Sequence, residues 1–104
     1  MKRISDALGS VSDKVFHFEA EPGTSAPYIV WAEEIQGDTV WADDRQERAS
    51  LQGSIDLYTK DAHEPLKGKV ERALNTGEIS WYLNSVQYEE ETGLLHYEWV
   101  WEVD

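Results

Sequence analysis

Alternating apolar and polar residues predict two strands in the second half of the chain. Between residues 49 and 58, Ala49, Leu51, Gly53, Ile55 and Leu57 alternate with polar residues and Tyr58. Between 94 and 103, Leu95, Tyr97, Trp99, Trp101 and Val103 share one face, and His96, Glu98, Val100 and Glu102 share the other. Because successive side chains of a strand point to opposite faces, each segment predicts a strand with one buried face and one facing solvent or a partner.

Further strands are predicted where β-branched and aromatic residues lie between turn residues. Residues 28–32 follow Pro27 and read as a strand, and residues 15–19 form a shorter one before a loop at 20–27. A turn at 37–38 leads to a short return strand at 39–41. Residues 78–90 and 94–103 flank a loop with a glycine, which predicts a hairpin.

Apolar residues at helical spacing predict two helices. Ile4, Leu8 and Val11 suggest a short N-terminal helix over 3–9. Leu66, Val70 and Leu74 form a stripe over about 65–75, with Pro65 suited to the first turn and Asp61 or Glu64 able to cap it. Residues 75–77 close that helix.

These elements predict a single α+β domain over residues 1–104. We expect an antiparallel sheet of about four to five strands, packed against the short N-terminal helix and the helix near 65–75. Strands joined by short turns favour antiparallel neighbours over a βαβ arrangement. A chain of 104 residues has room for one hydrophobic core.

The charge distribution excludes a basic nucleic-acid-binding surface. The chain carries 21 acidic residues against nine Lys and Arg, for a net charge of −12. No Lys or Arg stands between Lys14 and Arg45, and none follows Arg72. Such a chain repels phosphate, so specific nucleic-acid binding is not expected. There is no cysteine, no apolar run of membrane-spanning length and no signal-peptide pattern near the start, so no membrane partner is expected.

No motif in the sequence predicts catalysis, a cofactor or a metal. His17, His63 and His96 are far apart and have no metal-ligand spacing. Nucleophile elbows, glycine-rich phosphate loops and HExxH are absent from the sequence. Asp43 and Asp44 are adjacent but lack the spaced pattern of a calcium loop. A catalytic pair of carboxylates is spatial and not sequential, so the sequence leaves that alternative open.

The order of three segments resembles the tail-terminator, or tail-completion, proteins of long-tailed phages and prophages. In that family a "PYIVY"-like strand precedes a "V-Q-I-D-x-Y/F-(S/T)" strand and a "V-x-x-A-L" helix. Residues 27–31 (PYIVW), 54–60 (SIDLYTK) and 70–74 (VERAL) stand in this order. The similarity extends over nearly the whole chain. The predicted N-terminal helix is shorter than in the family, and the interval 32–48 is unusually acidic.

The resemblance implies a structural role without covalent chemistry. Family members assemble as a ring, typically of six copies, that caps the tail tube and joins it to the head. The partners it implies are further copies of the chain, the tail tube protein and a head–tail connector protein. Assembly would take place in the cytoplasm of the host bacterium, and the protein would then lie in the virion tail.

DNA would pass through the lumen of such a ring without binding, because an acidic wall repels its phosphates. We therefore hypothesise that acids within 33–44 or 89–91 face the lumen or the tube. Aromatic residues dominate protein interfaces, and we expect Trp99 and Trp101 in the core and Trp31 and Trp41 at subunit contacts. The interface candidates are Trp41, Trp31, Asp43, Asp44, Glu89, Glu90 and Glu91.

Three other functions fit the sequence. A small acidic inhibitor or immunity-type protein would block a basic enzyme through charge complementarity, and the net charge fits it equally well. A different head–tail connector component is hard to separate from a terminator by sequence. An enzyme that uses carboxylates is the weakest alternative.

Overall fold

The structure, a computed structural model, describes residues 2–34 and 51–103 and contains two helices and five strands in those ranges. The predicted turn at 37–38 and return strand at 39–41 lie outside the described residues. The elements, in chain order, are α1 (Lys2–Gly9), β1 (Val15–His17), β2 (Tyr28–Glu33), β3 (Leu51–Thr59), α2 (Pro65–Thr76), β4 (Ser80–Glu89) and β5 (Leu94–Val103).

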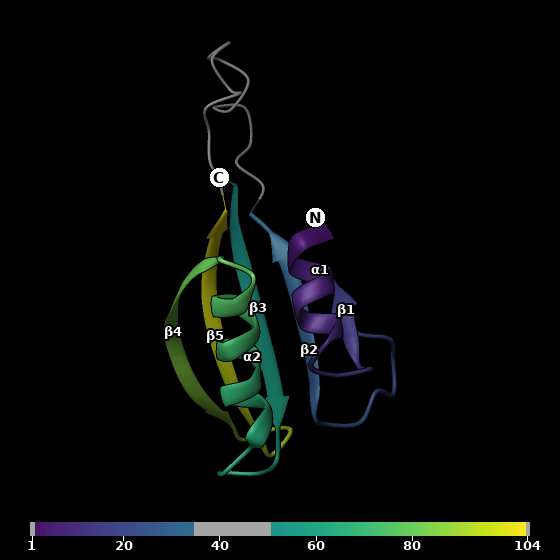
Figure 1. Ribbon diagram of the computed structural model, residues 1–104. Coiled ribbons are helices and arrows are strands. Elements are labelled where there is room, and N and C mark those ends of the chain that lie inside the picture. Colours follow the sequence, from purple (N-terminus) through teal and green to yellow (C-terminus); the bar gives the residue numbers. More distant parts are fainter. Residues whose placement is uncertain (1, 35–50, 104) are drawn as a thin grey trace.

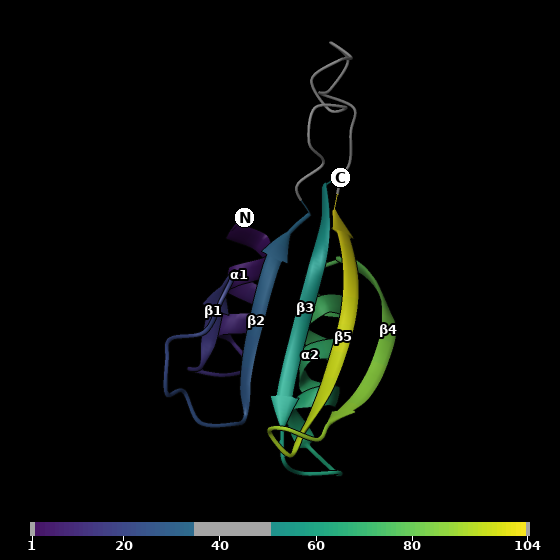
Figure 2. The ribbon, with the colours of Figure 1, turned by 180° about the vertical axis from the view of Figure 1, so that it is seen from behind.

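The strands form one sheet in the order β1-β2-β3-β5-β4. Both helices pack on the same face of this sheet (Figure 1). In the view from behind, β2, β3 and β5 lie in front with no helix over them (Figure 2). The described part of the chain therefore has two layers, and the predicted α+β class is confirmed.

Strand directions differ from the prediction at two places. β1 pairs with β2 in parallel, with Phe16 opposite Val30. The segment 18–27 runs back outside β1 before β2 begins, so both strands point the same way (Figures 1 and 2). β3 and β4 also run in the same direction, because each is antiparallel to β5, which lies between them. The connection through α2 is thus a crossover with a strand inserted. Among the described neighbouring pairs β1–β2 is parallel, and the other three are antiparallel as expected.

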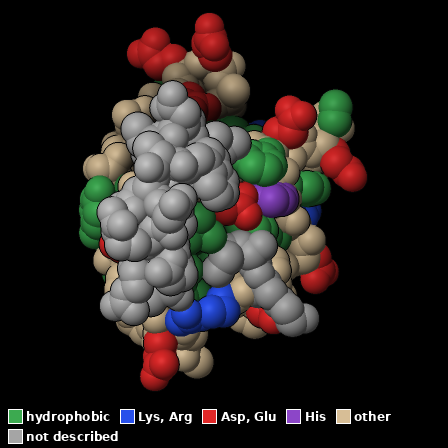
Figure 3. All heavy atoms as spheres, turned by 90° about the horizontal axis from the view of Figure 1, so that it is seen from above, with side chains coloured by type: hydrophobic (Ala, Val, Ile, Leu, Met, Phe, Trp, Pro, Cys, Tyr) green, Lys and Arg blue, Asp and Glu red, His purple; other side chains and the backbone are tan. Residues whose placement is uncertain are grey.

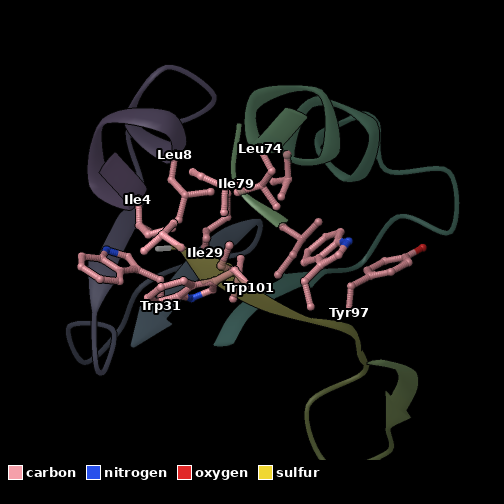
Figure 4. Close-up of a cluster of buried hydrophobic side chains, with 13 residues drawn as sticks. Ile4, Leu8, Ile29, Trp31, Leu74, Ile79, Tyr97 and Trp101 are labelled. Atoms are coloured by element: carbon pink, nitrogen blue, oxygen red, sulfur yellow. The ribbon is translucent and has the colours of Figure 1, made fainter. Parts of the chain in front are cut away.

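The helices pack against the sheet through their predicted apolar stripes. Ile4 and Leu8 of α1, and Leu74 of α2 with Ile79 just beyond it, point toward the sheet (Figure 4). From the sheet they meet β-strand side chains that are all buried. These are Ile29, Trp31, Ile55, Leu57, Tyr97, Trp99, Trp101 and Val103.

A glycine on β3 makes room for the indole of Trp101. A Cβ atom added at Gly53 would lie 2.0 Å from the Ala32 carbonyl oxygen and 2.6 Å from the Trp101 ring. The indole Nε1 of Trp101 donates to the Ser54 carbonyl oxygen at 3.0 Å. A large aromatic residue therefore packs flat against the strand at this point without leaving its N–H unsatisfied.

The ends of α2 follow the sequence signals. Glu64 is the N-cap, and its side chain accepts from the Leu66 backbone N–H at 3.0 Å. After the helix, Arg3 of α1 donates to the carbonyl oxygens of Gly77 and Glu78 at 2.8 and 2.9 Å. This contact fixes α1 against the C-terminal end of α2, next to the start of β4. At the far end of β4, Gly93 takes φ 73° in the turn to β5, as its position predicts.

Candidate interaction surface on the open sheet face

The face of the sheet turned away from the helices, here called the open face, is formed by the polar half of each alternating strand. Its central residues come in cross-strand pairs. Asp56 lies opposite Glu98, Ser54 opposite Val100, and Tyr58 opposite His96. β2 adds Tyr28 beside Tyr58 and Val30 beside Asp56. The same alternation that builds the core thus places these residues on one surface.

A row of rings crosses the open face from β1 to β5. Phe16 meets Tyr28 edge-on, with ring centroids 6.5 Å apart. Tyr28 stacks on Tyr58 at 4.9 Å, and Tyr58 stacks on His96 at 4.3 Å. Stacked cross-strand rings stabilise a sheet. They also place aromatic rings on this face without interruption from β1 to β5.

His96 lies between two carboxylates. Its Nε2 is 2.6 Å from Asp56 Oδ1, and its Nδ1 is 3.3 Å from Glu89 Oε2. Only the imidazolium form has a proton on both ring nitrogens, so this geometry suits a charged ring. Asp56 and His96 are 40 residues apart in sequence, and the β3–β5 pairing brings them together. A charged cluster is therefore held at one end of the ring row.

Burial and neighbouring carboxylates shift the pKa values of groups on this face. Burial raises the pKa of Asp56, although the hydrogen bond and charge of His96 oppose the shift. Burial, followed by the charges of Asp56 and Glu89, raises the pKa of Tyr58 to about 12. The pKa of Tyr28 is raised by burial and then by Glu89. Burial is the largest cause of the Tyr58 shift, and the negative potential of the nearby acids adds to it.

The five strands contain no Lys or Arg. In the described residues every such side chain belongs to a helix or to a connection. These are Lys2, Arg3, Lys14, Lys60, Lys67, Lys69 and Arg72. An end-on view of the molecule shows acidic side chains at several places around the surface (Figure 3). The strands thus carry acids without bases, whereas the helices and connections of the described part carry both.

The imidazole of His96 is engaged on both of its ring nitrogens. Both ring nitrogens of His96 face carboxylates, which leaves neither to activate a hydroxyl nucleophile. Within residues 2–34 and 51–103, no group of three His, Cys, Asp or Glu side chains is placed to hold a metal ion. A second pair, His17 with Glu33 at 2.7 Å, lies on the helix side, where the His17 ring stacks on Trp31.

The interface candidates from the sequence have different outcomes. Trp31 is only 4% exposed, so the expectation that it is an exposed contact residue is wrong. The alternation of β2 places it beside Ile29 on the helix side, where it joins the core. Trp99 and Trp101 are buried as expected. Trp41, Asp43 and Asp44 lie outside the described residues.

Glu89, Glu90 and Glu91 lie where β4 turns into β5. Glu90 and Glu91 are exposed, and Glu89 is partly buried beside His96. Their role at an interface stays a prediction. Sequence reasoning named His96 only as an ordinary strand residue and did not single out Asp56, Tyr58 or Tyr28. The alternation placed Asp56 and Tyr58 on the exposed side of their strand, and the missing information was which strand lies next to β3.

No described helix is both long enough and apolar enough to cross a membrane.

Comparisons with known proteins give a match in fold. No protein-family model matches the chain, and no curated protein matches it. Among solved structures, a chain of the structure titled "Virion of native gene transfer agent (GTA) particle" superimposes with a TM-score of 0.53. The match covers 95% of this chain and 81% of that chain, at 14% sequence identity. The α+β architecture described here is therefore similar to that of a polypeptide found in a gene transfer agent virion.

Proposed function

We propose that this chain is a structural protein of a phage virion, and that it acts as a tail terminator. In this role six copies of the chain form a ring on the end of the tail tube. The observation that carries the proposal is the fold shared with a chain of the gene transfer agent virion over almost the whole length. The order of the 27–31, 54–60 and 70–74 segments supports it independently.

The electrostatics of the chain are compatible with a ring through which DNA passes. The sheet carries acids and no Lys or Arg, so a subunit that turns its sheet or its 89–91 turn to the lumen would repel phosphate.

The test is to co-express the chain with the tail tube protein of the same genome and to image the products by negative stain. We expect tubes that stop growing and carry a ring at one end, and tubes of uncontrolled length when the chain is omitted. Light scattering of the capped fraction would count the copies per end. Tubes that never acquire the chain, at any ratio of the two proteins, would contradict the proposal.

The lack of Lys and Arg on the strands also favours a second candidate, a small acidic protein that blocks a basic enzyme. An open face of acids and rings is the kind of surface that attracts a basic partner. Such a protein would form a 1:1 complex whose affinity falls steeply with salt. A stable ring on tube ends would exclude this reading.

A further inference from the structure

β4 is the long free edge of the sheet. It spans ten residues and pairs only with β5, so its other side has no neighbouring strand among the described residues. The opposite edge, β1, has three residues, and the 18–27 segment runs outside it (Figures 1 and 2). An uncovered edge strand presents backbone N–H and C=O groups to any extended chain that approaches it.

The apolar side chains exposed on the described surface are concentrated on this strand. Four of the six exposed large hydrophobic residues belong to β4: Tyr82 (58% exposed), Leu83 (36%), Val86 (50%) and Tyr88 (63%). The register shift between Leu83 and Ser85 keeps Val86 on the same side as Leu83, facing the helical layer. Beyond its first residues, where Trp81 Nε1 donates to Asn75 Oδ1 of α2, the strand curves away from the helix (Figure 1). The exposed side chains of Leu83, Val86 and Tyr88 therefore form an apolar strip along this edge, here called the apolar shelf.

Acidic residues lie at both ends of this shelf. Residues 80–88 carry no charged side chain, in a chain of which 29% is charged. Glu78 precedes them, and Glu89, Glu90 and Glu91 follow. Two protective residues common on edge strands, Lys and Pro, are absent from β4, and the register shift between Leu83 and Ser85 is the one irregularity along the described strand. Two copies of β4 paired with each other would bring these acids together, because the 78–104 segment has no Lys or Arg.

We propose that β4 is a docking edge for an extended segment of a different polypeptide. This segment has apolar residues at alternate positions, Lys or Arg at its flanks and no Asp or Glu. Its backbone pairs with β4, its apolar side chains cover Leu83, Val86 and Tyr88, and its basic flanks face Glu78 at one end and the 89–91 acids at the other. The inference goes beyond the tail-terminator role and stands without it.

The test uses two synthetic peptides with the same core of alternating Val and Thr, one with two Lys at each end and one with two Glu. Each is titrated into the full chain while backbone amide signals are followed by NMR and affinity by fluorescence anisotropy. We expect the Lys-flanked peptide to bind at least about tenfold more tightly at low salt and to lose that advantage at high salt. The amides that shift and gain exchange protection should be those of β4.

Matched variants separate the edge from the rest of the surface. Val86→Lys should weaken binding of the Lys-flanked peptide by about tenfold or more, and Tyr88→Lys should act in the same direction. Phe18→Lys changes a side chain of similar exposure outside β4 and should leave affinity within about twofold. All three side chains are at least half exposed, so the variants should keep the native amide spectrum.

Three outcomes would overturn the proposal. Equal binding of the two peptides would remove the role of the acids, and unchanged binding by Val86→Lys would remove the role of β4. If the chain alone forms larger species with rising concentration, and its β4 amides become protected as it does so, the occupant is a second copy and not a different polypeptide.

Discussion

The two faces of the sheet are built from the same strands but serve different ends. On the helix side, β3 and β5 present Ile55, Leu57, Trp99 and Trp101, all fully buried. On the open face the intervening residues include Asp56, Tyr58, His96 and Glu98, which keep partial contact with solvent. One face supplies the apolar burial that holds the fold, and the other can hold charge because its cluster is internally paired. Substitutions on the open face should therefore cost less stability than substitutions in the core.

The largest effect should come from emptying the covered face. Trp101→Ala removes a fully buried indole and its hydrogen bond to Ser54, so we expect a loss of about 3–5 kcal/mol in the free energy of unfolding. Tyr82→Ala removes a ring that is 58% exposed on the open side and should cost less than about 1 kcal/mol. Urea denaturation of both variants measures the contrast. Similar losses for the two would mean that the open side carries as much packing as the core.

Much of the covered face could be predicted from the sequence, because it depends on local periodicity. The alternation in 94–103 placed Trp99 and Trp101 in the core, and the Leu66–Val70–Leu74 stripe marked the helix that covers them. The open-face cluster could not be predicted in the same way. It depends on β3 lying next to β5 across the α2 crossover, and no local signal reports which distant strands pair.

Trp31 shows a second limit of sequence reasoning. Because aromatic residues dominate interfaces, Trp31 was expected at a subunit contact, but the burial of one strand face depends on which face the helices cover. In β2 the helix-covered face is the one that carries Ile29 and Trp31, because α1 packs on that side. The parallel pairing of β1 with β2 depends on the path of the 18–27 segment. The sequence marks that segment as a loop without specifying where it leads.

An intermediate effect is expected from breaking the charged cluster of the open face. In the His96→Gln variant the neutral amide cannot balance the charges of Asp56 and Glu89. The ionised, partly buried carboxylate of Asp56 therefore loses its partner. We expect a loss of about 1–2 kcal/mol at neutral pH. Adding Asp56→Asn to the His96→Gln variant should restore part of the lost stability, because the amide carries no charge. A double-mutant cycle with no coupling between positions 56 and 96 would contradict the role of the pair.

The pH dependence of that penalty has a definite sign. Burial raises the pKa of Asp56 above its ordinary 3.8. Ionisation of this carboxyl is therefore less favourable in the folded than in the unfolded chain. The contribution of Asp56 to the free energy of unfolding is fully present below pH 3.8 and is lost as pH rises through the raised pKa. The difference in stability between the native chain and His96→Gln should accordingly shrink as the solution is acidified through this range.

The smallest effect is spectroscopic and concerns the ring row. With a pKa of about 12, Tyr58 should ionise later than an ordinary tyrosine, whose pKa is 10.0. In the unfolded chain Tyr58 loses its proton first, so the stability it contributes is complete below pH 10 and is lost as pH rises from 10 to 12. Tyrosinate absorbance should show a late step that is absent from Tyr58→Phe. Because the charges of Asp56 and Glu89 contribute to the shift, the same step should move to lower pH in Asp56→Asn. If the late step stays at the same pH in Asp56→Asn, burial alone causes the shift of the Tyr58 pKa. That result would contradict a negative potential on the open face.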